Sequence, residues 1–377
     1  MSPRRKILYV NHEVECGGAE HSLLELIQGL DHERFEVHLA CSMEGPLTDR
    51  ARELGAEIHL VPMLFQGKLR KLWGLFRASM RLRKLIRSAG IQLVHTNSLI
   101  AGYCGIFAAK LCNIPSIWHV RDISYPDPAK KLCTQARRVI ANSKATAESL
   151  DVPEQHENKV EVIYNGVAPR FFEQAESGRE VREELQVNAN EKLVGIFGRL
   201  DPWKGHRDFL RASKRILSSH SNTTFVVVGD VLFAGTRTLQ EGFRERLEDY
   251  TREIGVFGKV LFLGHRTDVP RLLAAMSVVV HPSAEPEPFG RVIAEAHAVG
   301  VPVVASALGG IPEIITPGVN GFLFTPGDTE ELAECVCRLL GDEDLASELG
   351  RTGREMAEHR FTQGQHAAEM EAIYDEL

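Results

Sequence analysis

The sequence predicts an α/β fold made of two Rossmann-like domains. Its 377 residues are enough for two α/β domains of ordinary size. Short apolar runs typical of buried parallel strands, such as Ile7–Val10 and Val278–Val280, alternate with helical patterns along the chain. Both of these runs lead into a loop that contains glycine and begins a helix. Open α/β sheets bind their ligands at such loops, beyond the carboxyl ends of the strands.

The first half of the chain contains a regular series of strand and helix patterns. The expected strands are Ile7–Val10, Phe35–Cys41, Glu57–Val61, Leu93–Asn97, Ser116–Val120 and Val139–Asn142. The expected helices are Ala19–Leu30, Leu47–Leu54, Ile100–Leu111 and Lys144–Leu150, and Ser143 is placed to cap the last of them. Gly17 and Gly18 lie between the first strand and the first helix, where backbone N–H groups are able to hold an anion. The same pair of glycines is also compatible with a simple tight turn.

A basic stretch interrupts this series. The span Ile58–Arg121 contains no Asp or Glu, and Lys68–Arg87 contains eight basic residues. Helical spacing places Arg70, Arg77, Arg81 and Lys84 on one stripe, and Leu69, Leu72, Trp73, Phe76 and Met80 on another. Two interpretations remain open. The helix either docks on an anionic membrane surface, or packs on its own sheet with a solvated basic face.

The second half repeats the alternation. Its expected strands are Leu193–Phe197, Thr224–Val228, Val260–Leu263, Val278–Val280, Val301–Ala305 and Gly321–Phe324, and its expected helices are Arg207–Leu217, Val292–His297, Thr329–Leu340 and a C-terminal helix within Phe361–Leu377. Arg199 and Lys204 follow the first of these strands, on a loop that begins at Gly198. Two cations beside a strand end suit a pyrophosphate group, although solvated surface cations are the ordinary alternative.

The loop after Val278–Val280 contains the most distinctive chemistry. Gly290 begins the next helix and has no Cβ, so a ligand is able to approach its backbone. Helix N-termini attract phosphate, here through the free N–H groups of Phe289, Gly290 and Arg291, and Pro288 before them is a further expected donor-binding position. Glu287 and Glu295 are eight positions apart, slightly more than two helical turns, so both carboxylates are able to face one ligand. A solvated loop acid and an unremarkable helix acid explain the pair equally well on spacing alone.

Composition excludes several classes of protein. The net charge of −7 argues against general nucleic-acid binding, and the seven cysteines include no CxxC pair, which is typical of a reduced compartment. The sequence shows neither a signal peptide nor a transmembrane stretch, and we expect a cytoplasmic protein, with possible peripheral attachment to the inner face of the membrane.

The loop and its surroundings resemble the EX7E signature of the retaining glycosyltransferases of family GT4, which have the GT-B fold. The residues that carry the resemblance are Glu287, Phe289-Gly290, Glu295-Ala296, Gly300, Pro302, Gly309-Gly310, Glu313 and Asn320-Gly321. Other matches are the GGAE segment at Gly17, the NGV segment at Asn165 and the GR…KG pattern of Arg199 and Lys204. The resemblance implies two Rossmann-like domains facing each other across a cleft. We expect them at residues 1–168 and 169–360, with a C-terminal helix, 361–377, returning to the first domain.

The resemblance also implies roles for individual residues. It assigns Arg199 and Lys204 to the diphosphate of a nucleotide-sugar donor, Glu295 to the ribose and Glu287 to the sugar. His119 would contact the donor sugar near the reacting carbon, with weaker cleft roles for Arg121 and Asp122. The expected donor-binding positions further include Gly17, Gly18, Gly198, Gly229, Gly264, His265 and Arg266. Two roles are open to Asp268: contact with an amine of the nucleobase, and the N-cap of the following helix, which is the more ordinary of the two.

The expected activity is transfer of a hexose-type sugar from a UDP- or GDP-sugar to a hydroxyl of a glycan or lipid-linked glycan of the cell envelope. The sequence has no DxD motif placed to bind a diphosphate, so we expect no cofactor and no essential metal, with the two cations replacing one. Two alternatives share the nucleotide site. The first is a GT-B-like sugar-nucleotide epimerase or hydrolase, and the second is a non-catalytic nucleotide-sugar-binding protein.

Overall fold

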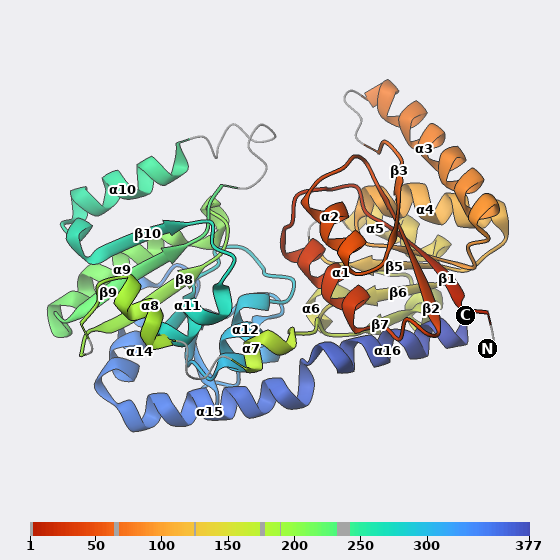
Figure 1. Ribbon diagram of the computed structural model, residues 1–377. Helices are drawn as coiled ribbons and strands as arrows, with labels where there is room; N and C mark the ends of the chain where they lie inside the picture. Colours follow the sequence, from red (N-terminus) through yellow and green to blue (C-terminus); the bar gives the residue numbers. More distant parts are fainter. Residues whose placement is uncertain (1–2, 64–67, 124–125, 174–177, 189, 232–241) are drawn as a thin grey trace. The chain divides into compact units, whose positions relative to one another are not determined.

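The structure is a computed structural model that describes residues 3–63, 68–123, 126–173, 178–188, 190–231 and 242–377 (Figure 1). It divides into two compact units, one formed by Met1–Gly166 with Gln363–Leu377 and the other by Val167–Thr362. Each unit is a parallel sheet covered by helices on both faces, so the expected pair of Rossmann-like domains is confirmed.

The sheet of the first unit has seven parallel strands in the order β3-β2-β1-β4-β5-β6-β7. The strands are β1 (Arg5–Val10), β2 (Phe35–Cys41), β3 (Glu57–Leu60), β4 (Leu93–Thr96), β5 (Ser116–Val120), β6 (Arg138–Ala141) and β7 (Val160–Val162). The helices are α1 (Gly18–Gly29), α2 (Pro46–Glu53), α3 (Lys68–Ala89), α4 (Leu99–Cys112), α5 (Pro126–Gln135), α6 (Lys144–Ser149) and α16 (Gln363–Glu376), with a 3₁₀ turn, η1, at Glu154–Lys159.

The inner strands of this sheet are apolar on both sides, because helices cover both faces. On one face, Ile7 and Tyr9 pack with α1 and with α16, and on the other, Leu8 and Val10 pack with α3 and α4. Helix α16 is fixed to this unit by the buried Tyr374, whose hydroxyl lies 2.8 Å from that of Tyr9. The last helix of the chain therefore belongs to the core of the first unit.

The sheet of the second unit has six parallel strands in the order β10-β9-β8-β11-β12-β13. They are β8 (Lys192–Phe197), β9 (Thr223–Val228), β10 (Val260–Gly264), β11 (Val278–His281), β12 (Val303–Ser306) and β13 (Gly321–Phe324). The helices are α7 (Pro169–Phe172), α8 (Gly178–Glu184), α9 (His206–Ser219), α10 (Phe243–Ile254), α11 (Val269–Ala275), α12 (Arg291–Val299), α13 (Ile311–Ile314), α14 (Thr329–Gly341) and α15 (Glu343–Arg360), with 3₁₀ turns η2 at Pro202–Lys204 and η3 at Phe257–Lys259.

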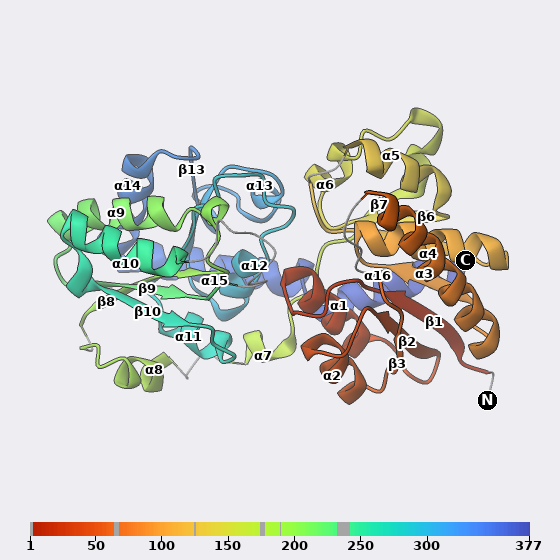
Figure 2. The same cartoon turned by 90° about the horizontal axis from the view of Figure 1, so that it is seen from above.

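Figure 2 shows this sheet from above, with α9 and α14 on one face and α8 and α11 on the other. The buried core includes Phe209 from α9, Phe225 from β9 and Val336 from α14. In both units the strand order reverses next to the first strand, between β1 and β4 and between β8 and β11. These reversals are the topological switch points at which doubly wound sheets bind ligands.

Candidate functional site

The loops that follow β8 and β11 meet at the switch point of the second sheet. Strands β8 and β11 are direct neighbours in the sheet. Lys204 is carried by the loop after β8 and Glu287 by the loop after β11, and Lys204 Nζ lies 2.7 Å from Glu287 Oε2. Their side chains are only 15% and 12% exposed, so the ion pair is largely withdrawn from water. The structure thus brings together two residues that the sequence separates by 83 positions.

Glu287 Oε2 is the centre of a cluster of polar groups. Besides Lys204, it lies 3.1 Å from Ser283 Oγ and 3.3 Å from His281 Nε2. Burial alone would raise the pKa of Glu287, but Lys204 and His281 together hold it well below its ordinary value. The carboxylate is therefore ionised at neutral pH and is suited to accept hydrogen bonds. His281 and Ser283 were not identified from the sequence, although their place directly after a buried strand was a signal for them.

Glycines allow the loops of this site to approach one another closely. Gly205 has φ of +74°, and a Cβ there would lie 1.7 Å from the carbonyl oxygen of Pro282. Gly309 has φ of +60°, and a Cβ there would lie 2.2 Å from the carbonyl oxygen of Glu287. The next amide, of Gly310, donates a 2.8 Å hydrogen bond to that same oxygen. The backbone of Glu287 is thus held in place by a turn that only glycine is able to form without strain.

Helix α12 begins directly after this loop, as expected. Gly290 precedes it with φ of +91°, and Phe289 is buried with its ring centroid 5.6 Å from that of Phe361. Glu295 lies one turn into the helix, is 6% exposed and accepts a 2.5 Å hydrogen bond from Arg291. Pro288 is half-buried beside them. Glu287 and Glu295 therefore occupy one region, and the carboxylate of Glu295 is engaged by a cation.

The two predicted cations share an aromatic neighbour. Lys204 Nζ lies 3.9 Å from the ring centroid of Trp203, and the guanidinium of Arg199 lies 5.7 Å from it. Arg199 Nε also lies 3.5 Å from Asp201. The geometry places two positive charges around one indole ring, an arrangement favoured by cation–π attraction. Trp203 lies between the two basic residues in the sequence and was not selected.

Three of the predicted glycines lie side by side at the carboxyl ends of β8, β9 and β10. Gly198 N donates to the carbonyl of Val228, and Gly229 N donates to that of Gly264. A Cβ on Gly229, where φ is +136°, would lie 1.9 Å from the carbonyl oxygen of Gly198. The absence of a Cβ at Gly229 therefore lets the ends of these strands approach one another closely.

The residues after Gly264 form a local group of ion pairs, and their place in the base pocket stays a prediction. His265 is exposed, whereas Arg266 forms ion pairs with Glu184 at 2.7 Å and with Asp268 at 2.8 Å. Asp268 does stand at the N-cap position of α11, but its side chain makes no capping hydrogen bond. The guanidinium of Arg266 instead lowers the pKa of Asp268. The interpretation of Asp268 as a cap is thus correct in position and wrong in contact, because the nearby cation binds the carboxylate.

In the first unit, His119 is the end of a buried chain of hydrogen bonds. Its Nδ1 lies 3.3 Å from Nη2 of Arg121 and 3.2 Å from Nε2 of His95. His95 Nδ1 lies 2.8 Å from the hydroxyl of Tyr374, which meets the hydroxyl of Tyr9. A guanidinium only donates, so Nδ1 of His119 is an acceptor, and the ring proton of the neutral imidazole is on Nε2. Burial, together with Arg121, lowers the pKa of His119 well below its ordinary value and keeps the ring neutral.

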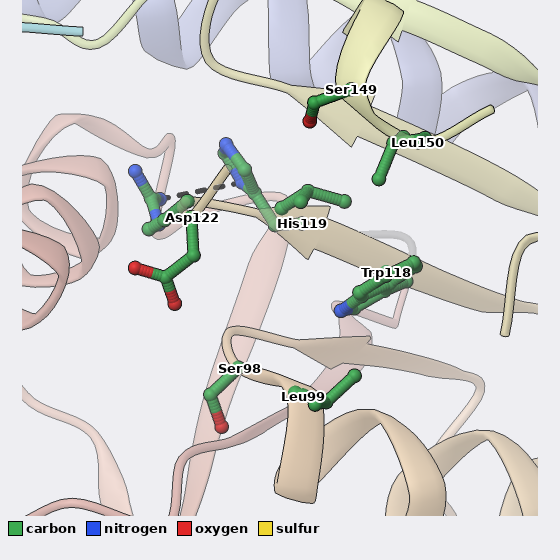
Figure 3. A pocket seen from close by; sticks show the side chains of 9 residues that line it. Ser98, Leu99, Trp118, His119, Asp122, Ser149 and Leu150 are labelled. Carbon is green, nitrogen blue, oxygen red and sulfur yellow. Dashed lines mark hydrogen bonds between the residues drawn. The ribbon is translucent and has the colours of Figure 1, made fainter. Parts of the chain in front are cut away.

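This series of hydrogen bonds leaves the Nε2–H donor of His119 available. Its Nε2 is buried and has no hydrogen-bond partner within the described part of the chain. His119 lines a pocket with Ser98, Asp122 and Ser149 among its neighbours (Figure 3). A buried N–H without a partner is costly, and a ligand hydroxyl or carbonyl would satisfy it.

Two other predictions for the first unit need correction in detail. Arg121 is 7% exposed and donates hydrogen bonds to Asn97, Ser22 and Asn165, so it connects the end of β5 to neighbouring segments. Asp122 is exposed beside the pocket. The Gly17 amide already donates to the carboxylate of Glu20, so it is not free to hold an anion. The carboxylate that closes the first turn of α1 competes for this N–H.

Helix α3 packs on the rest of the unit with a stripe other than the apolar one identified from the sequence. Ala78, Leu82 and Ile86 face α4 and the sheet. In the stripe identified from the sequence, Leu72 and Trp73 are each 70% exposed and Phe76 is 49% exposed, while Met80 is half-buried. The side chains of Arg77, Arg81 and Lys84 are exposed as well, while those of Leu69 and Arg70 lie outside the described residues. Within the described ranges, no helix has the length and apolar character needed to cross a bilayer.

Comparisons with known proteins agree with the two-unit architecture. Residues 16–171 match the family described as Glycosyltransferase Family 4, and residues 178–356 match the family described as Glycosyl transferases group 1. An uncharacterized glycosyltransferase of Methanocaldococcus jannaschii is 29% identical over 80% of each chain. A UDP-Gal:alpha-D-GlcNAc-diphosphoundecaprenol alpha-1,3-galactosyltransferase of Escherichia coli is 26% identical over 90% of this chain and 89% of its own.

Among solved structures, HepE of Anabaena, determined in complex with UDP-glucose, has a TM-score of 0.86 and 27% identity, over 99% of this chain and 100% of its own. The matches of sequence segments and of fold therefore agree over nearly the whole chain. With a segment that matches glycosyltransferase family 4, a segment that matches glycosyl transferases group 1 and two Rossmann-like units, the chain is a glycosyltransferase with the GT-B fold.

Proposed function

We propose that the protein is a retaining glycosyltransferase that moves a hexose-type sugar from a nucleotide-diphosphate donor to a hydroxyl of a cell-envelope glycan or lipid-linked glycan. The observation that carries this proposal is the Lys204–Glu287 pair at the switch point of the second sheet. It puts a cation for a leaving diphosphate directly beside an ionised carboxylate for sugar hydroxyls. A UDP-sugar is favoured over a GDP-sugar, because the structure of HepE contains UDP-glucose and the related Escherichia coli enzyme is named for UDP-Gal.

The second unit would hold the donor. Lys204 and Arg199, which flank Trp203, would neutralise the charge that grows on the diphosphate as the glycosidic bond breaks. Glu295 would accept hydrogen bonds from the ribose hydroxyls, and Glu287 from those of the sugar. Gly198, where a Cβ would meet nothing within 4 Å, would leave room for the flat base beside Gly229 and Gly264. In this scheme the two cations neutralise the diphosphate charge, which a divalent metal neutralises in other enzymes.

The Nε2–H of His119 is assigned to donate a hydrogen bond to the donor sugar. The ring is neutral and its proton is fixed on Nε2 by Arg121 and His95, so it would act as a donor and not as a base. None of the residues assigned here is placed as a covalent nucleophile. Retention would therefore follow from attack on the same face from which the phosphate leaves, with that phosphate helping to deprotonate the acceptor.

The two glutamates give the sharpest test of this donor site. Glu295→Ala should weaken binding of both UDP and UDP-glucose, whereas Glu287→Ala should spare UDP and weaken only UDP-glucose. Isothermal titration calorimetry of each variant with both ligands separates the roles, and Glu334→Ala, an exposed acid on α14, is the matched control. Equal losses for the two ligands in both variants would contradict the assignment.

We further propose that α3 docks this protein on an anionic membrane surface. Its exposed Leu72, Trp73 and Phe76 form an apolar surface that the protein itself does not cover, and Trp73 and Phe76 meet edge to face at 6.3 Å. Arg77, Arg81 and Lys84 are exposed on the same helix, and each would contribute about 1 kcal/mol near anionic lipid. Docking of this kind would bring a lipid-linked acceptor close to the first unit.

Co-sedimentation with liposomes tests the docking proposal. Vesicles that contain phosphatidylserine should bind the wild-type protein at low salt, and added salt should release it. Replacement of Arg77, Arg81 and Lys84 by Gln should abolish binding. Replacement of Arg179, Arg215 and Arg351, exposed residues of the second unit, removes the same charge and should leave binding intact. Wild-type protein that stays in the supernatant at low salt would favour a soluble acceptor.

A further inference from the structure

A cluster of two histidines and a glutamate lies at the edge of the first sheet. Strand β3 is an edge strand of that sheet and pairs in parallel with β2. In this pairing, His38 is opposite Glu57 and Ala40 is opposite His59. Successive side chains of a strand alternate between the two faces of a sheet, so His38, Glu57 and His59 share one face. The cluster belongs to the first unit, whereas the Lys204–Glu287 pair belongs to the second.

The three side chains present their ligand atoms to a common point. His38 Nδ1 lies 3.1 Å from His59 Nε2 and 3.4 Å from Glu57 Oε2, and His59 Nε2 lies 3.6 Å from Glu57 Oε1. In a tetrahedral zinc site with metal–nitrogen and metal–oxygen bonds of about 2.0–2.2 Å, neighbouring ligand atoms are about 3.3–3.6 Å apart. The two contacts of Glu57 end on different carboxylate oxygens, so the donor atoms form a near-triangle whose sides are close to the edges of such a tetrahedron.

A second carboxylate orients His38 for this task. The other ring nitrogen of His38, Nε2, lies 3.1 Å from Glu36 Oε1, and this oxygen lies 3.0 Å from Lys6 Nζ. Glu36 thus lies between a lysine and this imidazole, and it accepts the proton of Nε2. The lone pair of Nδ1 then points into the triangle. Metal-binding histidines are commonly oriented by a carboxylate in this way.

Exposure also suits a site that a metal is able to enter. The side chain of His38 is 1% exposed and gives one rigid ligand, whereas that of Glu57 is 62% exposed and is able to move. Because the cluster lies at the sheet edge, the fourth position is open to water.

We propose that His38, Glu57 and His59 bind one divalent transition-metal ion, with Zn²⁺ as the best fit, and that this ion fastens the edge strand β3 to β2. Two imidazoles and one carboxylate suit Zn²⁺ and its neighbours in the first transition row, whereas Mg²⁺ and Ca²⁺ require mainly oxygen ligands. None of the three residues is among those assigned to the donor, so the role of the ion is structural. Without a metal, the alternative is a plain hydrogen bond from His59 Nε2–H to His38 Nδ1.

The test uses the full-length, untagged protein after treatment with a chelator. Native mass spectrometry and calorimetry should show one equivalent of Zn²⁺ bound, and Zn²⁺ should raise the melting temperature whereas Mg²⁺ should not. Co²⁺ in the same site should give the intense visible absorption of a tetrahedral complex. Circular dichroism of each variant shows whether it has folded before binding is compared.

Variants identify the ligands. His59→Ala should abolish the equivalent of Zn²⁺ and the increase in melting temperature, and Glu36→Gln, which changes only the orienting carboxylate, should weaken binding by about 10-fold or more. His156→Ala, which removes a partly exposed histidine elsewhere in the first unit, should change neither. Wild-type protein that binds no Zn²⁺, or His59→Ala that binds it as well as wild type, would leave only the hydrogen-bonded pair of histidines and overturn the proposal.

Discussion

The turn at Gly309 should be far less tolerant of a methyl group than an equally twisted turn nearby. Both Gly309, with φ of +60°, and Gly318, with φ of +75°, adopt a backbone conformation that alanine disfavours by about 1–2 kcal/mol. At Gly318 a Cβ would meet nothing within 4 Å. At Gly309 it would lie 2.2 Å from the carbonyl oxygen and 2.7 Å from the amide nitrogen of Glu287. The pair therefore separates the cost of backbone conformation from the cost of collision.

The expected loss of stability follows from these contacts. Gly318→Ala should lower the free energy of unfolding by only the conformational cost of about 1–2 kcal/mol. Gly309→Ala adds displacement of the Glu287 backbone, at about 1–3 kcal/mol, and the hydrogen bond from Gly310 N–H, at about 1 kcal/mol. The total for Gly309→Ala is about 3–6 kcal/mol.

Urea denaturation of both variants measures the stability difference, and calorimetry with UDP and UDP-glucose measures the function. Gly309→Ala should weaken UDP-glucose more than UDP, because the displaced Glu287 is assigned to the sugar, whereas Gly318→Ala should leave both affinities unchanged. If the two variants lose equal stability and bind both ligands alike, the turn at Gly309 does not hold Glu287 in its binding position, and this reasoning is wrong.

Three further results are expected. Arg199→Ala and Lys204→Ala should each lower kcat by about 100-fold or more, the equivalent of about 3 kcal/mol in the transition state. The control Arg211→Ala, on the nearby α9, should not lower it. Near-wild-type turnover in Arg199→Ala or Lys204→Ala would show that the residue replaced is not part of the donor site. His119→Ala should lower kcat for transfer while leaving the affinity for UDP unchanged, and calorimetry beside steady-state kinetics shows whether it does. Burial lowers the pKa of His297 to about 4 from an ordinary value of 6.5, so this residue's contribution to stability is fully present above pH 6.5 and is lost as the pH falls toward 4. Between pH 7 and pH 5 the loss is about 2 kcal/mol. The free energy of unfolding of His297→Gln, measured by urea denaturation, should therefore fall by about 2 kcal/mol less than that of the wild type over this range.

The positions of most strands along the chain were predictable because both sheets are parallel and buried. Apolar runs such as Phe35–Cys41 are visible wherever helices cover both faces of a strand, and β2 has the expected bounds. The packing face of α3 was not predictable, because the helix contains two apolar stripes. The stripe with Ala78, Leu82 and Ile86 packs on the unit, and the larger side chains Leu72 and Trp73 remain exposed. Side-chain size alone does not show which stripe the rest of the fold covers.

The individual residues of the site were easier to predict than their partners. Glu287 and Lys204 stand out by motif, but no local pattern indicates that they form an ion pair, since they come from different strand ends. Arg121 was predicted from its place at a strand end, and the structure uses it within a buried network instead. The triangle of His38, Glu57 and His59 was missed because its members combine only through the register of two strands.

The central claim is that this chain transfers sugar from a nucleotide donor to an acceptor. The most direct measurement incubates the purified protein with UDP-glucose or UDP-galactose, labelled in the sugar, together with envelope lipid and glycan fractions. The account predicts label in an acceptor with the anomeric configuration of the donor, and its loss in Glu287→Ala. Label that is recovered only as free sugar or as an epimerised nucleotide sugar, at the same rate without any acceptor, would contradict the claim and identify a hydrolase or epimerase.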